Sequence, residues 1–167
     1  MSSAPDLLGP VVAFRWWRVI GDHLSSPFNP VRWDRRQVEA RCYPANRALL
    51  FGDGWLAEPH QAPHPACQCG IYAYHAPPRR PRIPDPDRAA GIVSVWGRLE
   101  VHRDGVRAQH ARVEALACCP EWGSAHVAQM RAIASRLGVP LIAYDELPAA
   151  ARRFGAPIPA TLLPAAA

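Results

Sequence analysis

The apolar and β-branched positions along the chain predict several strands of a sheet. Residues Val11–Ile20 are rich in β-branched and aromatic side chains and run into Gly21, a pattern typical of a strand that enters a turn. Residues 24–33 contain two prolines and therefore predict only an edge strand or an irregular return. Residues Val38–Cys42 alternate briefly and indicate a second strand.

The clearest pattern lies in residues 91–116 and predicts a β-hairpin. Two β-rich runs, Gly91–His102 and Val106–Leu116, meet at Arg103, Asp104 and Gly105. An Asp-Gly pair is a preferred two-residue turn between antiparallel strands, because glycine tolerates the positive φ that such turns require. We therefore expect the turn at 104–105.

That turn implies a register in which Leu99 lies opposite His110 and Gly97 lies opposite Arg112. Arg112 and Glu114 then share a face with apolar residues, so we expect both to be paired, because a buried charge without a partner is costly. Two interpretations follow: a pocket with a polar floor, or a bulge that turns these polar groups outward. The candidate binding residues of this region are Arg112, Glu114 and Trp96.

The C-terminal third of the chain predicts helices. Apolar residues recur at helical spacing between Ser124, which can cap a helix, and Gly138, which can end it. Residues 139–144 resemble a short buried strand, and Asp145 can cap a last helix.

These elements predict an α+β fold, in which an antiparallel sheet built around the hairpin at 91–116 is followed by one or two C-terminal helices. The length of 167 residues fits one domain. We expect a disordered N-terminus at 1–10, a single α+β domain at 11–155 with a proline-rich loop at 77–88, and a frayed Pro/Ala tail at 156–167.

Composition narrows the class of protein. No long apolar run and no export signal is visible, so we expect a cytoplasmic protein that does not bind membranes, and the five cysteines are then thiols or metal ligands rather than a disulfide framework. Lysine is absent, and all 19 basic residues are arginine, which codon bias in a GC-rich genome explains. Phosphate-binding glycine loops and the Gly-x-Ser-x-Gly motif are also absent, which argues against common nucleotide enzymes and serine hydrolases.

Candidate chemistry concentrates in residues 60–75, which hold three histidines and two cysteines. Neutral imidazole and thiolate are the ligands that structural zinc prefers in its tetrahedral sites. We take His64, Cys67 and Cys69 as three metal ligands and His60 as the fourth, with His75 or Cys42 as alternatives for the fourth position. A proline-rich loop gains folding free energy from such a metal ion.

Two other interpretations of the same segment stay open. If residues 70–75 form a helix, the helix dipole lowers the pKa of a thiol at its start, so Cys67 or Cys69 would be a nucleophile with His110 as its base. If they form a strand, that argument is lost. Alternatively, both cysteines pack as small apolar residues and the histidines belong to a polar loop.

The motif formed by Cys67-x-Cys69-Gly-Ile-Tyr-Ala and the run Val95-Trp-Gly-Arg-Leu-Glu-Val-His102 resembles an uncharacterised family of small proteins common in GC-rich actinobacteria. The resemblance extends from about Ala62 to Ile142. It implies that Cys67, Cys69, Trp96 and His102 belong to one architectural unit, and it implies no activity.

The function we predict is that of a small binding or regulatory protein, because no complete catalytic constellation is visible. Its loop at 60–75 would be held together by zinc or by packed thiols, and its partner would be a protein or a nucleic-acid complex. A further alternative is single-stranded nucleic-acid binding through Trp16, Trp17 and nearby arginines, which combine ring stacking with phosphate contacts.

Overall fold

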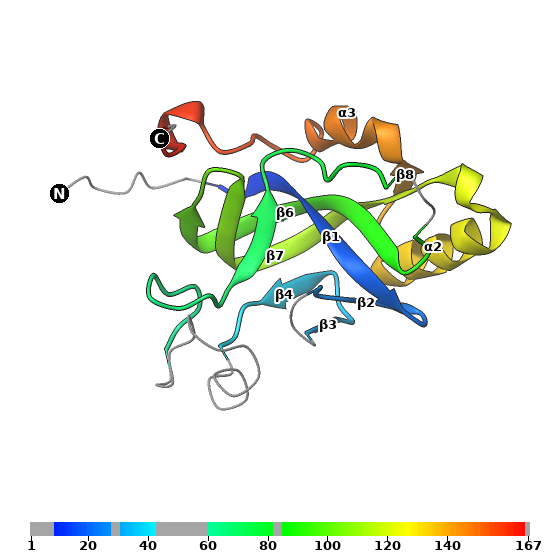
Figure 1. The fold of residues 1–167 in the computed structure, drawn as a ribbon, viewed down its shortest axis with the longest axis horizontal. Coiled ribbons are helices and arrows are strands. Elements are labelled where there is room, and N and C mark those ends of the chain that lie inside the picture. The colour runs from blue at the N-terminus through cyan, green and yellow to red at the C-terminus, as the bar shows by residue number, and fades with distance from the viewer. Residues whose placement is uncertain (1–8, 28–30, 43–59, 82–84, 166–167) are drawn as a thin grey trace.

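The computed structural model describes residues 9–27, 31–42, 60–81 and 85–165. Most of the N-terminus that we expect to be disordered lies outside these residues. One mixed sheet of eight strands dominates the described part of the chain (Figure 1). Its strands are β1 (Val11–Ile20), β2 (His23–Ser25), β3 (Arg32–Trp33), β4 (Gln37–Glu39), β5 (Ile71–Tyr74), β6 (Arg88–Val101), β7 (Gly105–Cys118) and β8 (Leu141–Ala143).

Four of these strands pair in a closed ring. β1 pairs with β6 along its length and with β5 through Phe14 and Tyr74, while β7 pairs with both β6 and β5. β2 and β3 extend the sheet from β1, whereas β4 pairs with β7 next to β5. The predicted α+β fold around a β-hairpin is confirmed, and β8 adds one parallel pairing to β7.

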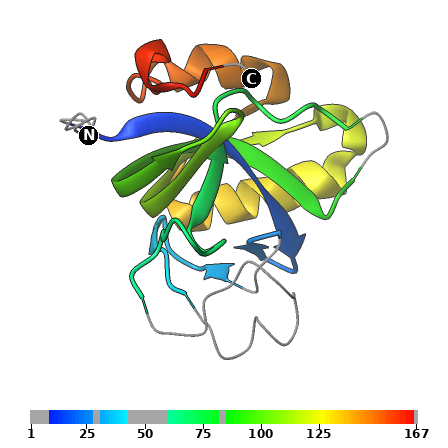
Figure 2. The same cartoon turned by 60° about the vertical axis from the view of Figure 1, so that its left-hand side comes forward.

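The sheet separates two apolar cores, and consecutive residues of β1 face opposite ones. Val11 and Ala13 belong to the core that includes the apolar face of α2 (Ser124–Leu137). Val12 and Phe14 belong to the core that includes α3 (Leu147–Ala151). Figure 2 accordingly shows α2 on one side of the strands and α3 on the other. The sheet is therefore covered on both faces, which explains why apolar residues occupy both sides of β1.

The turn of the hairpin differs from the prediction by one residue. Val101 pairs with Val106, and the amide of His102 donates to the carbonyl of Gly105 at 2.8 Å, so Arg103 and Asp104 form the turn. Gly105 is instead the first residue of β7. A Cβ atom at that position would overlap the carbonyl oxygen of Ala73 in β5, so glycine is needed there for the close approach of a third strand.

The predicted register of the hairpin is also wrong. Leu99 pairs with Ala108 rather than His110, and Arg112 pairs with Ser94 rather than Gly97. The shifted turn changes the pairing, and two bulge-like register shifts, one of them at Gly97 with φ of 79°, change it again. Bulges of this kind leave little trace in an alternating sequence pattern.

The helices follow the prediction closely at α2 and loosely afterwards. α2 ends before Gly138, which adopts the left-handed conformation with φ of 66°. Ser124 is the first residue of the helix and does not cap it, because the cap position is taken by Gly123. A 3-10 turn at Tyr144–Glu146 precedes α3, so Asp145 lies before the last helix and does not cap it. Short 3-10 turns also occur at Pro120–Trp122 and Ala160–Leu162. No helix in the described ranges is long and apolar enough to cross a membrane.

The segment that we expect to be frayed lies against the sheet. The amide of Val12 donates to the carbonyl of Ala156 at 2.9 Å, and Ile158 is buried in the core that contains α2. This part of the tail therefore contributes to the packing of β1.

Candidate metal centre

The pairing of β4 and β5 with the same strand brings distant cysteines together. Both strands pair with the same edge of β7, where Glu39 lies opposite His110 and Ile71 lies opposite Ala108. The end of β4 is therefore next to the start of β5. Cys42 follows β4 and Cys69 precedes β5, so their thiols meet at this junction.

Four side chains converge there, and we call them the Cys/His cluster: Cys42, His60, Cys67 and Cys69. Their ligand atoms all lie within 4.8 Å of one another, and the group could hold a metal ion. The Sγ atoms of Cys42 and Cys67 are 3.8 Å apart, and Nε2 of His60 is 3.3 Å from Sγ of Cys69.

These distances fit a tetrahedral site. With zinc bonds of about 2.3 Å to sulfur and 2.0–2.1 Å to nitrogen, neighbouring ligand atoms lie about 3.5–3.8 Å apart. The Cys42–Cys67 and His60–Cys69 distances are close to that interval, and the other separations lie within 4.8 Å, so a rearrangement of about 1 Å or less would bring the four atoms to tetrahedral spacing.

Burial separates the cluster from solvent on one side. Cys67 and Cys69 are 2% and 0% exposed, and they pack with Ala62 into a small apolar cluster that Cys42 covers. Burial, followed by the neighbouring Cys67 thiol, raises the pKa of Cys42 to about 12 and also raises the pKa of Cys69. Without a metal these thiols therefore stay protonated, whereas a bound cation would deprotonate them.

The structure places the remaining predicted ligands outside the cluster. Nδ1 of His64 accepts a hydrogen bond from the amide of Ala66 at 3.2 Å, and its ring lies 4.9 Å from the ring of His60. Nε2 of His75 lies 2.9 Å from the carbonyl oxygen of His102 at the hairpin turn. Cys42, the alternative fourth ligand, takes the position that we assigned to His64.

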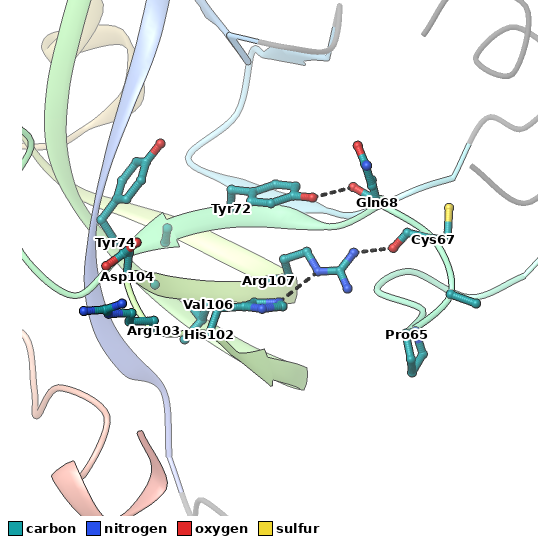
Figure 3. A pocket seen from close by; sticks show the side chains of 13 residues that line it. Pro65, Cys67, Gln68, Tyr72, Tyr74, His102, Arg103, Asp104, Val106 and Arg107 are labelled. Atoms are coloured by element: carbon teal, nitrogen blue, oxygen red, sulfur yellow. Dashed lines mark hydrogen bonds between the residues drawn. The ribbon is translucent and has the colours of Figure 1, made fainter. Parts of the chain in front are cut away.

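Arg107 connects the cysteine loop to the hairpin, and no pattern in the sequence identifies it. Its buried guanidinium donates through Nη1 to the carbonyls of Cys67 and Cys69 and through Nη2 to the carboxylate of Glu100. Nε donates to Nε2 of His102 at 3.2 Å. Figure 3 shows this side chain between the loop and His102. One charged group thus fixes the backbone that carries two of the four candidate ligands.

The structure removes the basis for a cysteine activated by a helix. Of the two alternatives for residues 70–75, the structure has the strand, at 71–74, so no helix dipole acts on Cys67 or Cys69. The raised pKa of Cys69 also disfavours a reactive thiolate. His110, the proposed base, stacks on Trp96 with ring centroids 5.5 Å apart.

Arg112 and Glu114 are paired, as expected, but they form a structural ion cluster with a third partner. The carboxylate of Glu114 accepts hydrogen bonds from Ser94, from Arg112 at 2.8 Å and from Arg36 at 2.8 Å. Burial alone would raise the pKa of Glu114, but these donors outweigh it and hold that pKa below its ordinary value. Both oxygens of the Glu114 carboxylate accept hydrogen bonds from protein donors, and Glu114 itself is buried rather than turned outward, while Arg112 is 44% exposed.

Comparison of the chain with family models, curated protein sequences and solved structures gave no match.

Proposed function

We propose that this protein is a small binding protein whose Cys/His cluster holds a structural zinc ion, and that its partner is a protein or a nucleic-acid complex. The observation that carries the proposal is the convergence of three thiols and one imidazole within 4.8 Å at the junction of β4, β5 and β7.

The ligand set supports a structural rather than a catalytic ion. Structural zinc sites have four protein ligands, commonly cysteine and histidine, whereas catalytic sites keep one position open for water or substrate. The Cys/His cluster supplies three sulfur atoms and one nitrogen. The soft thiolates favour zinc over magnesium or calcium, which prefer oxygen ligands.

The position of the cluster supports a role in holding the loop. Residues 60–70 contain no strand or helix, so their backbone gains little from the sheet. A metal ion bound by Cys42 on one side and by Cys67 and Cys69 on the other would join this loop to the end of β4. Metal binding of this kind contributes directly to folding.

Elemental analysis of the reduced full-length protein tests the proposal. We expect about one equivalent of zinc per chain in the wild type, and less than about 0.2 equivalents in Cys42→Ser and Cys69→Ser. Cobalt substitution adds an independent measurement, because its sulfur-to-metal absorption reports the number of thiolate ligands.

Matched controls come from the same residue types outside the cluster. Cys118→Ser changes another buried thiol, and His64→Ala changes the neighbouring imidazole; both should keep a full equivalent of metal. A wild-type protein with less than about 0.2 equivalents of any transition metal would overturn the proposal. Loss of metal in His64→Ala but not in His60→Ala would overturn the assignment of the fourth ligand.

A further inference from the structure

Two adjoining cavities form one groove beside the cysteine loop. The first has a volume of about 750 Å³ and is lined by residues 65–68, by 72–74 of β5 and by 102–107 at the hairpin turn (Figure 3). The second, of about 460 Å³, is lined by Trp16, residues 74–79, Arg88 and the same turn. Both cavities share Tyr74, Arg103 and Asp104, so we treat them as a single groove.

Positive charge dominates the walls of this groove. Among the residues that the structure describes, four arginines line it, against one acidic side chain, Asp104; the arginines are Arg79, Arg88, Arg103 and Arg107. Arg107 is already paired with Glu100. Arg79 and Arg103 are exposed and form no ion pair within the described part of the chain, so their guanidinium groups are available to an anionic partner.

Aromatic rings lie between these charges. Tyr72 is 39% exposed, although its hydroxyl donates to the carbonyl of Gln68 at 2.8 Å, which fixes the orientation of the ring. Trp16 lines the other end of the groove, where the Arg88 guanidinium lies 4.3 Å from the ring centroid. Trp17, in contrast, is fully buried, so the expected pair of tryptophans reduces to Trp16.

We infer that this groove binds single-stranded nucleic acid. Arg79 and Arg103 would contact phosphates, and Tyr72 and Tyr74 would stack on unpaired bases. The combination favours this ligand because stacking needs free base faces, which a duplex hides, whereas an acidic peptide would use the arginines and leave the rings without a function. The inference rests on the proposed function in one respect: the metal-binding loop supplies the wall at 65–68.

Fluorescence anisotropy with a labelled 12-nucleotide oligo(dT) and oligo(rU) tests this inference on the full-length protein. We expect saturable binding that weakens as salt rises. The double variant Arg79→Ala/Arg103→Ala should bind at least about 10-fold more weakly, with a salt slope reduced by about 1.4, because each lost single-strand phosphate contact removes about 0.7.

A matched control removes the same charge elsewhere. Arg152 and Arg153 are exposed after α3 and line neither cavity. The variant Arg152→Ala/Arg153→Ala should therefore change affinity less than about 2-fold and leave the salt slope as in the wild type. Tyr72→Leu should weaken binding about 5-fold or more while leaving the salt slope unchanged, since stacking involves no counterion release.

Several results would overturn the inference. These are absence of binding at low salt, equal weakening in the two double variants, and competition by poly-glutamate as strong as that by unlabelled oligo(dT). Metal content measured on the same samples separates the two proposals. A protein with one equivalent of zinc that binds no oligonucleotide would refute only the groove, and one that binds oligonucleotide without metal would refute only the zinc site.

Discussion

The hairpin of β6 and β7 and the loop at residues 60–70 are held in place by different kinds of interaction. The hairpin has ten paired positions, and its central residues Val93, Val95 and Val113 are fully buried, so its stability is distributed over many backbone bonds and apolar contacts. The loop has no such pairing and depends on the Cys/His cluster and on Arg107. A few side chains, among them Cys42 and Arg107 from outside the loop, therefore hold the loop in place, whereas many backbone bonds and apolar contacts hold the hairpin.

Loss of a large core side chain should have the largest effect and should act on the sheet alone. Trp17 is fully buried and packs edge-on against Trp33 with ring centroids 5.3 Å apart. We expect Trp17→Ala to lower the free energy of unfolding by about 3–5 kcal/mol. Urea unfolding measures this, once with excess zinc and once with a chelator.

The comparison of the two conditions makes that experiment informative. If the sheet and the loop are energetically independent, Trp17→Ala lowers the free energy of unfolding by the same amount with and without metal. A cost that changes by more than about 0.5 kcal/mol between the conditions would show instead that the two regions are coupled. Trp96→Ala, which changes a partly exposed ring, serves as the control and should cost much less.

The ion cluster around Glu114 should have an intermediate effect that depends on pH. Glu114→Gln keeps the size of the side chain and removes its charge, and we expect a loss of about 1–3 kcal/mol at pH 7, since the charged hydrogen bonds weaken. Arg36 and Arg112 are 43% and 44% exposed, so water can solvate them in the variant and limit the loss.

The sign of the pH dependence follows from the lowered pKa of Glu114. Its contribution is fully present above the ordinary glutamate pKa of about 4.3 and is lost as pH falls through the lower folded-state value. Wild type and Glu114→Gln should therefore differ by a constant amount above about pH 5.5 and converge in acid. Unfolding curves measured between neutral and acidic pH test this, and a difference that grows toward low pH would contradict it.

Removal of the proposed metal ion should have the smallest effect on the sheet and a large one on the loop. The amide of Cys67 donates to the carbonyl of His64 at 2.9 Å, and chelation should release its protection from hydrogen exchange. The amide of Leu116, which donates to Pro140 within the packed sheet, should keep its protection. Hydrogen exchange followed by mass spectrometry resolves the two segments. Loss of protection at both amides on chelation would contradict the prediction, because it would show that metal removal destabilises the loop and the sheet together.

Local patterns explain which parts of the fold could be predicted. The strand at Val11–Ile20 is confirmed with the same boundaries, because a run of β-branched and aromatic residues followed by glycine encodes both its conformation and its end. The helix that ends before Gly138 is confirmed for a similar reason, although its cap is Gly123 rather than Ser124. The hairpin is confirmed as an element, but its register is not. Gly105 is required by the close approach of β5 and does not belong to the turn, which lies one residue earlier.

The candidate site likewise contains residues that local sequence identifies and residues that it does not. Cys67, Cys69 and His60 are close in sequence, and their residue types alone make them candidate ligands. Arg107 and Arg36 could not be identified, because an arginine in a strand or a loop gives no signal of the carbonyl or carboxylate that it meets in the fold. The same holds for the groove, whose walls come from five separate segments.

The sequence by itself therefore determined the strand at Val11–Ile20, the hairpin as an element, the main helix and the segment where soft metal ligands concentrate, since each depends on residues within a few positions of one another. Only the tertiary structure decided that Cys42 joins the cluster and His64 does not. The physical reason is the shared pairing of β4 and β5 along one edge of β7, which brings the end of one strand to the start of the other across a long stretch of chain.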